Sequence, residues 1–136
     1  MSDAFEEDFR TALLADSAIA AAIATRAAWG QLPQAQPRPL LVLWDIVVTP
    51  EYTMRGIEGL ESRIVQIDCR AETFAAAKTL ARDVRARLET IGGTIGATEF
   101  QRCFFRSERD MGTLTGDPVE PDQCVQVDTL VWFRAA

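Results

Sequence analysis

The sequence predicts an α+β domain: an antiparallel sheet with two helices packed on one face, in the order α-β-β-α-β-β. Two observations support this prediction. Segments in which apolar and polar residues alternate, as they do in strands, come in pairs, and each pair follows a segment with helical apolar spacing. The chain also lacks a repeated strand–helix–strand unit, which a parallel sheet would require. A length of 136 residues fits a single domain over residues 1–136.

The N-terminal segment predicts a helix that begins near Asp3, whose carboxylate can cap it. Four apolar residues share one face of this helix: Phe5, Phe9, Ala12 and Leu13. Asp16 and Ser17 form a second capping signal inside the pattern. We therefore expect one helix to about Ala15 and a shorter one through Ile23.

Two strands are expected in the next part of the chain, after a possible short strand near Ala28 and a proline-bearing connector over 31–39. The first covers Leu40–Thr49 and is apolar on both faces, so it should be covered on both sides. The second covers Arg63–Arg70 and alternates cleanly.

The second main helix is predicted from Thr73, with one apolar stripe and a glycine pair, Gly92 and Gly93, to end it. The stripe consists of Phe74, Ala77, Leu80, Ala81, Val84, Leu88 and Ile91. Two further strands are expected over 98–108 and 124–134.

Two long segments, Pro50–Ser62 and Met111–Asp122, are predicted to be loops because they contain glycine, proline and acidic residues. Loops of this length inside a small domain are usually functional or disordered. We therefore expect both to contact partners.

Charge and composition argue against several function classes. The net charge is −6, from 14 basic and 20 acidic residues, which disfavours binding to phosphate backbones or to anionic membranes. With no histidine and three scattered cysteines, neither a histidine-based catalytic site nor a zinc site is expected. The only glycine cluster follows a helix, the wrong side for a phosphate site. We expect no enzyme activity, no cofactor and no metal.

Free, half-buried thiols fit a reducing cytoplasm, and the acidic start of the chain does not resemble a signal peptide. Asp45 interrupts an apolar run, and a buried carboxylate needs a partner. We expect that partner to be an arginine from a neighbouring strand or a neighbouring subunit.

Positive charge gathers in two places that are candidate subunit or partner contacts. Arg102, Arg106 and Arg109 lie around two phenylalanines, a pattern that favours an interface or a solvated strand face over nucleic-acid stacking. Arg82 and Arg85 belong to the basic second helix, whereas the first helix and the segment 107–122 are acidic. Such complementary patches can set the register between copies.

Three stretches, in order, resemble the tail-completion or tail-terminator proteins of long-tailed phages and of gene transfer agents. These are 13–26 followed by the strand 40–48, then 63–78, then 107–110 with the strand 125–133. The resemblance implies a hexameric ring that ends the tail tube, joins it to a head-side connector or stopper protein, and lets DNA pass through its lumen without specific binding. It also implies a place in the tail of a virion or particle assembled in the bacterial cytoplasm, and no catalytic residues.

Three other readings remain open at this point. The chain could be another head–tail neck adaptor of the same kind of particle. It could instead be a ligand-binding α+β module with an apolar pocket around Trp44 and Trp132. A small enzyme is the least favoured, for the reasons given above.

Overall fold

The computed structural model describes residues 3–30, 39–53, 56–113 and 123–135. Within these residues the chain forms three helices and six strands. In chain order they are α1 (Asp3–Leu14), α2 (Ser17–Ile23), β1 (Ala27–Trp29), β2 (Leu40–Thr53), β3 (Gly56–Ala71), α3 (Phe74–Leu88), β4 (Gly93–Ile95), β5 (Thr98–Thr113) and β6 (Gln123–Ala135).

The strands form one sheet in the order β1-β2-β3-β6-β5-β4. Every neighbouring pair is antiparallel except β1 and β2, which run parallel. The prediction of a purely antiparallel sheet is therefore wrong at this edge. Ten residues separate Trp29 from Leu40 in the sequence, more than the tight turn that joins an antiparallel hairpin. The short strand expected near Ala28 is confirmed as β1.

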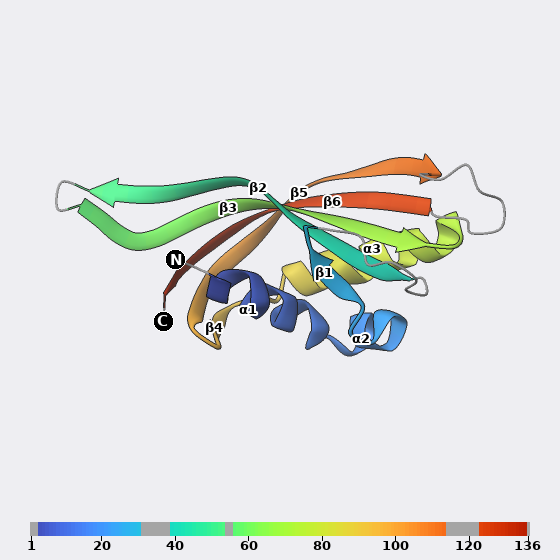
Figure 1. Cartoon of the computed structure of the whole chain (residues 1–136), viewed down its shortest axis with the longest axis horizontal. Helices are drawn as coiled ribbons and strands as arrows, with labels where there is room; N and C mark the ends of the chain where they lie inside the picture. Colours follow the sequence, from blue (N-terminus) through green and yellow to red (C-terminus); the bar gives the residue numbers. More distant parts are fainter. Residues whose placement is uncertain (1–2, 31–38, 54–55, 114–122, 136) are drawn as a thin grey trace.

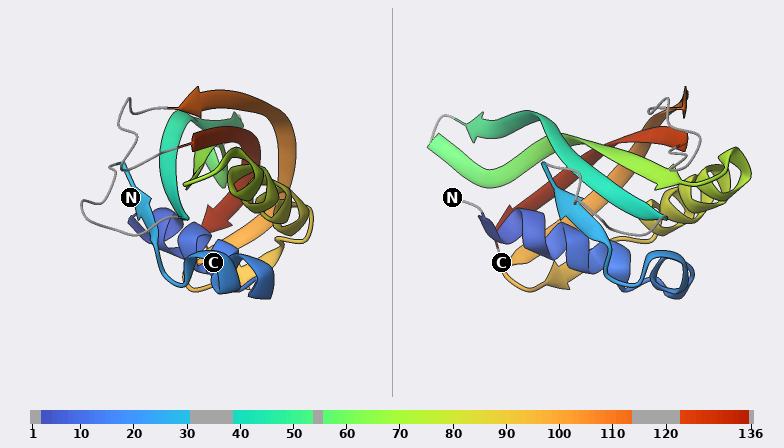
Figure 2. Two further views of the ribbon diagram at one scale, coloured as in Figure 1. Left: turned by 90° about the vertical axis from the view of Figure 1, so that its right-hand side faces the viewer. Right: turned by 45° about the vertical axis from the view of Figure 1, so that its right-hand side comes forward.

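The sheet is strongly curled, and all three helices lie on its concave side (Figures 1 and 2). The predicted six-element order counts neither α2 nor β1, which were expected separately as a short helix and a short strand, and it misses β4. Helix α1 bridges the two sides of the curl. The ring of Phe5 stacks on Phe133 of β6 at 4.2 Å between centroids and also lies against Trp29 of β1. The Asp8 carboxylate accepts hydrogen bonds from Ala97 N at 3.0 Å and Thr98 Oγ1 at 2.7 Å.

Local capping explains the helix starts. The Asp16 side chain accepts a hydrogen bond from Ile19 N at 3.1 Å, so the predicted break between two helices is confirmed. Thr73 caps α3 in the same way, through Ala76 N. Five residues of the predicted stripe are buried against the sheet: Ala77, Leu80, Ala81, Val84 and Leu88. The stripe is wrong at its start, because Phe74 in the first turn is 48% exposed.

The helix α3 ends at Leu88, before the glycine pair, and Ile91 is buried outside the helix. Between Glu89 and the start of β4 the backbone turns, and Gly93 adopts a φ of +83° that favours glycine.

The segment Pro50–Ser62 is not a loop. β2 continues to Thr53 and β3 starts at Gly56, so most of the segment is an extended hairpin that projects past the helices (Figure 1). Pro50 is tolerated because β2 is an edge strand here and needs no second ladder. Likewise β5 runs on to Thr113, so the prediction of a loop over 111–122 is wrong for residues 111–113. The remainder of that loop lies outside the described residues.

Candidate assembly surface

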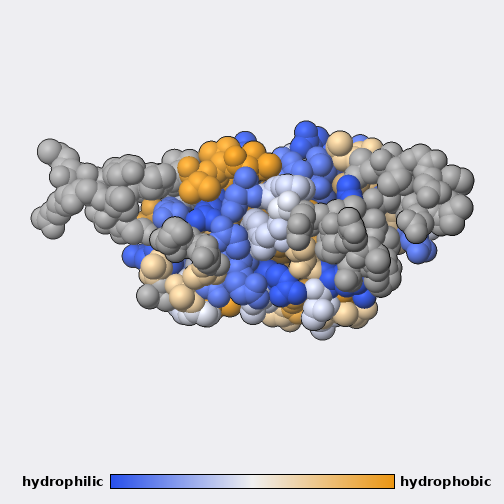
Figure 3. All heavy atoms as spheres, viewed as in Figure 1, coloured by the Kyte–Doolittle hydropathy of each residue, from blue (hydrophilic) through white to orange (hydrophobic). Residues whose placement is uncertain are grey.

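Both the pairing of the outer edge of β2 and the burial of its side chains change after Leu43. Up to this residue β1 pairs with its outer edge, and Leu40 to Leu43 are buried at 0–2% exposure. From Trp44 onward, none of the described strands pairs with this edge. The four apolar side chains that follow are 37–51% exposed: Trp44, Ile46, Val47 and Val48, here called the β2 apolar segment. Figure 3 shows a hydrophobic patch on this part of the surface.

This segment corrects the expectation that the whole strand would be covered on both sides. Whether a side chain is covered depends on the length of β1 and on where the helices end, and neither follows from the local pattern. A bulge between Asp45 and Val47 also shifts the register at this point.

Apolar side chains continue across the convex face of the sheet. Val47 pairs with Ile64, Ile64 with Leu130, and Leu130 with Phe104, so these four side chains lie side by side across four strands. Phe104, at the far end of the row, is 43% exposed, with the guanidinium of Arg102 5.1 Å from its ring centre. None of the described helices covers this face (Figures 1 and 2).

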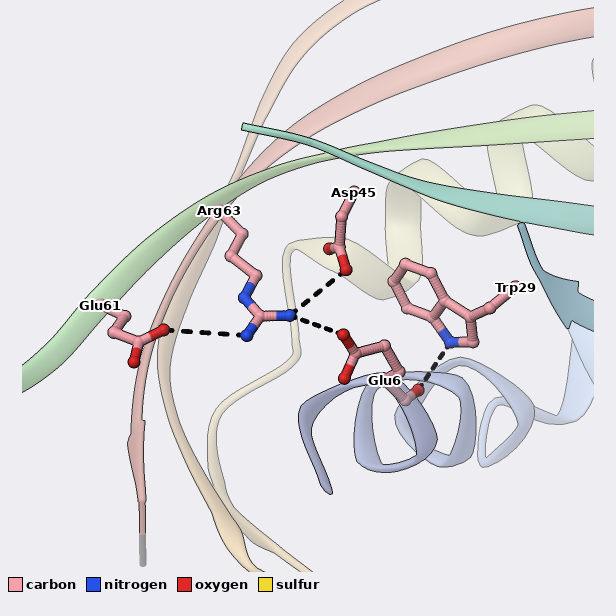
Figure 4. A network of polar contacts seen from close by, with 5 residues as sticks. All are labelled: Glu6, Trp29, Asp45, Glu61 and Arg63. Carbon is pink, nitrogen blue, oxygen red and sulfur yellow. Dashed lines mark hydrogen bonds and ion pairs between the residues drawn. The ribbon is translucent and has the colours of Figure 1, made fainter. Parts of the chain in front are cut away.

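Below the β2 apolar segment, on the concave side, one buried arginine joins three carboxylates (Figure 4). Nη1 of Arg63 lies 2.8 Å from Glu6 Oε1 and 3.3 Å from Asp45 Oδ2, and its Nη2 lies 3.8 Å from Glu61 Oε2. The guanidinium also stacks 4.4 Å over the ring of Phe5. This arrangement fastens the base of the β2–β3 hairpin to α1.

The partner of Asp45 is therefore an arginine from the neighbouring strand of the same chain, one of the two alternatives predicted. The pKa of Asp45 is raised to about 6, first by burial and second by a hydrogen bond with Glu6, whereas the charge of Arg63 acts in the opposite direction. Asp45 is thus paired with a cation of its own chain.

On the other side of the molecule, β5 has a second open edge. β4 pairs only with Thr98–Phe100, and the described part of the chain supplies no further partner for β5 beyond that point. Three arginines lie along this stretch. Arg102 stacks on Phe104, Arg106 is exposed at a bulge, and Arg109 reaches Gln126 at 3.1 Å and Asp128 at 3.8 Å.

The basic residues of α3 divide into inward and outward groups. Lys78 binds Glu108 at 2.6 Å and Asp110 at 2.9 Å, and these hydrogen bonds raise its pKa. The basic helix was predicted to face an acidic segment of another copy. Part of this charge pairing instead takes place within one chain. Arg85 stacks 4.1 Å over Phe105 of β5, and Arg82 is exposed.

The structure brings Arg85, Arg106 and Arg109 to the β5 side of the molecule and leaves Asp45 on the β2 side. Sequence reasoning missed the β2 apolar segment as a surface feature. Its only signal was a run of apolar residues on both faces of one strand, which equally fits a buried strand.

The chemistry available elsewhere is limited. All three cysteines are buried, at 0–4% exposure, and not half-buried as predicted. Burial raises the pKa of Cys103 to about 12, so this thiol stays protonated and inert. Across the described ranges, no group of three or more metal-ligating side chains could hold an ion. No described helix is long and apolar enough to cross a membrane.

Two of the comparisons with known proteins give matches. The model of the family "Tail completion protein gp17" matches residues 7–119. One solved structure, a chain described as "Virion of native gene transfer agent (GTA) particle", is 16% identical and superposes with a TM-score of 0.65 over 97% of this chain and 99% of that chain. At this identity the likeness shows the fold alone. None of the curated proteins compared with the chain matches it.

Proposed function

Because the chain belongs to the tail completion protein gp17 family, a family of phage-like tail structural proteins, we propose that copies of it form a ring that ends the tail tube. The ring, a hexamer in this proposal, stops tube growth at the head-proximal end. It then offers its other face to a head-side connector or stopper protein. DNA passes through the lumen without specific binding, and assembly takes place in the bacterial cytoplasm.

The observation that carries the proposal is the β2 apolar segment, with four apolar side chains 37–51% exposed beside an open strand edge. An exposed apolar edge strand tends to aggregate unless a partner covers it. Such a surface fits a subunit whose action is mating with other proteins. The fold likeness to a chain of a gene transfer agent virion adds a second, independent support.

The exposed arginines Arg82, Arg85, Arg106 and Arg109 are candidate contacts in this assembly, between copies or with the tube and connector. Asp45 contributes indirectly, by holding the hairpin through Arg63.

A tube-growth assay tests the proposal. Purified tail tube protein is allowed to polymerise alone and with this chain, and electron microscopy records tube lengths and tube ends. We expect shorter tubes with a ring at one end only. Tubes of unchanged length with bare ends, together with a strictly monomeric chain in light scattering, would refute the proposal.

The same assay distinguishes a tail terminator from a neck adaptor, because an adaptor would bind a finished tail without limiting tube growth. The ligand-binding alternative has less support. Trp44 pairs with Gln66 and Trp132 with Ser62, and β3 lies between β2 and β6. The two indoles are therefore attached about 13 Å apart along the strands, too far for one small apolar pocket.

A further inference from the structure

The two open edges of the sheet differ in charge. Beside the β2 apolar segment lie the carboxylates of Glu6, Asp45 and Glu61, with side chains 24–33% exposed. They share the single guanidinium of Arg63, so negative charge is in excess. We call this side, the open part of β2 with these carboxylates, the acidic edge.

The opposite side carries an excess of positive charge. Arg102, Arg106 and Arg109 lie along the open part of β5, and Arg85 stacks beside them on Phe105. Of the nearby carboxylates, Glu108 and Asp110 are bound by Lys78 of the same chain, and Asp128 lies 3.8 Å from Arg109, so the cations outnumber the carboxylates. We call this side, the open part of β5 with these four arginines, the basic edge. It also presents an apolar side chain, the 43% exposed Phe104.

We propose that the acidic edge of one copy docks against the basic edge of the next, so that the β2 apolar segment packs beside Phe104 and its flanking arginines. The inference rests on the proposed ring and identifies the contact between neighbouring copies, here called the joint. A joint between two different patches repeats head to tail, which is what a ring requires.

Strand directions are compatible with this joint. The neighbours β2, β3, β6 and β5 alternate in direction, so β5 runs opposite to β2. If the sheets of two copies continue with their convex faces on the same side, β5 of one copy lies antiparallel to β2 of the next. Bulges interrupt both edges, between Asp45 and Val47 on β2 and between Phe105 and Ser107 on β5. Side-chain packing and charge therefore carry the joint, more than a continuous hydrogen-bond ladder.

The symmetric alternative, β2 against β2, is disfavoured by charge. It would bring the carboxylates of two acidic edges together, and like charges across an interface oppose association. The same reasoning disfavours two basic edges facing each other.

Cysteine cross-linking tests the joint, because the three native thiols are buried and so shielded from a reagent in solution. Four double variants combine Ile46→Cys or Val48→Cys on β2 with Arg102→Cys or Arg106→Cys on β5. Each is treated with a short bifunctional maleimide, both free in solution and bound to tube ends, and run on a denaturing gel. We expect at least one double variant to give a ladder of multimers up to the ring size, and each single variant to give none.

Mixing provides the matched control. A β2 single variant mixed with a β5 single variant should give a mixed dimer and nothing larger. Homodimers of a β2 single variant would show the symmetric joint and overturn the inference. Rings without a ladder from any of the four double variants would also overturn it, while leaving the proposed function intact. A chain that neither forms rings nor limits tube growth would remove the proposed function itself.

Substitutions give a second readout. Arg102→Glu with Arg106→Glu should weaken self-association about tenfold or more, since it faces like charges across the joint. Val48→Ser should weaken it as well, whereas Phe74→Ser should not, although Phe74 is almost equally exposed, at 48% against 50%. Equal effects from Val48→Ser and Phe74→Ser, in proteins of unchanged melting temperature, would count against the joint.

Discussion

The guanidinium of Arg63 lies 3.3 Å from the carboxylate of Asp45 on the adjacent strand and 2.8 Å from that of Glu6 on α1. These contacts connect the β2–β3 hairpin, which carries the β2 apolar segment, to the helix that closes the curled sheet (Figure 4). The position of the proposed assembly surface therefore depends on one buried cation.

Replacing Arg63 with methionine should destabilise the fold by about 3 kcal/mol, because the partly buried carboxylates lose their shared partner. The Arg63 side chain is only 8% exposed, so water cannot replace it easily. Urea unfolding followed by circular dichroism measures the change.

The matched control is Arg134→Met. Arg134 also pairs with a carboxylate, Glu99 at 3.2 Å, but the two side chains are 49% and 41% exposed. Its loss should cost about 0.5 kcal/mol or less. Equal losses from both variants would mean that the buried network does not hold the hairpin to α1.

The raised pKa of Asp45 predicts a particular pH dependence. The folded state holds its proton up to about pH 6, whereas an ordinary aspartate releases it near 3.8. Asp45 therefore contributes stability that is complete below its unfolded pKa and is lost as pH rises through about 6. Asp45→Asn should remove this decline and gain about 1 kcal/mol above pH 7, less than the full shift implies because part of the side chain is solvated.

Unfolding free energies of the parent and of Asp45→Asn, measured from pH 4 to 8, provide the test. Carbon-detected NMR titration of the Asp45 carboxyl gives the pKa directly. A variant that is less stable than the parent at pH 7.5, with an unchanged slope between pH 4 and 6.5, would contradict the prediction.

Local signals in the sequence located the starts of α2 and α3 but not the exposure of β2. Asp16 and Thr73 cap helices through hydrogen bonds to residues three positions later, so a short stretch of sequence is enough to predict them. The burial of β2 depends on β1, a strand of three residues that covers it only to Leu43. The sequence predicts a loop over 50–62 because proline and glycine usually end strands. At an open sheet edge, however, a strand tolerates both.

The candidate site was predictable only in part, for the same reason. An arginine partner for Asp45 followed from the cost of a buried charge. Glu6, another carboxylate bound by Arg63, is 57 residues away from it in sequence, and only the curl of the sheet brings the two side chains together. The pairing of Lys78 with Glu108 inside one chain was missed, since charge patterning cannot distinguish contacts within a copy from contacts between copies.

The turn before β5 gives a test of how α1 closes the sheet. Gly96 has a φ of +61°, and a Cβ added there would overlap the Asp8 carboxylate that anchors α1 to this turn. Gly96→Ala should therefore cost about 2–3 kcal/mol, from left-handed strain together with weakened hydrogen bonds. Gly30→Ala is the control: its φ is +74°, but nothing lies within 4 Å of the added carbon, so only about 1 kcal/mol should be lost. Thermal unfolding compares the two, and equal losses would show that Asp8 does not anchor α1.

The outward arginines of α3 give the last prediction. Arg82 is exposed and Arg85 extends the basic edge from the concave side, while Lys78 is occupied by Glu108 and Asp110. Reversing both arginines to glutamate should therefore weaken self-association about tenfold or more, because like charges would then face the acidic edge of the next copy. Multi-angle light scattering across a concentration series measures the effect, and it should grow as the salt concentration falls. Circular dichroism must first show an intact fold, since Arg85 also stacks on Phe105. If the doubly reversed protein assembles as well as the parent at low salt, positive charge on α3 has no part in joining the copies.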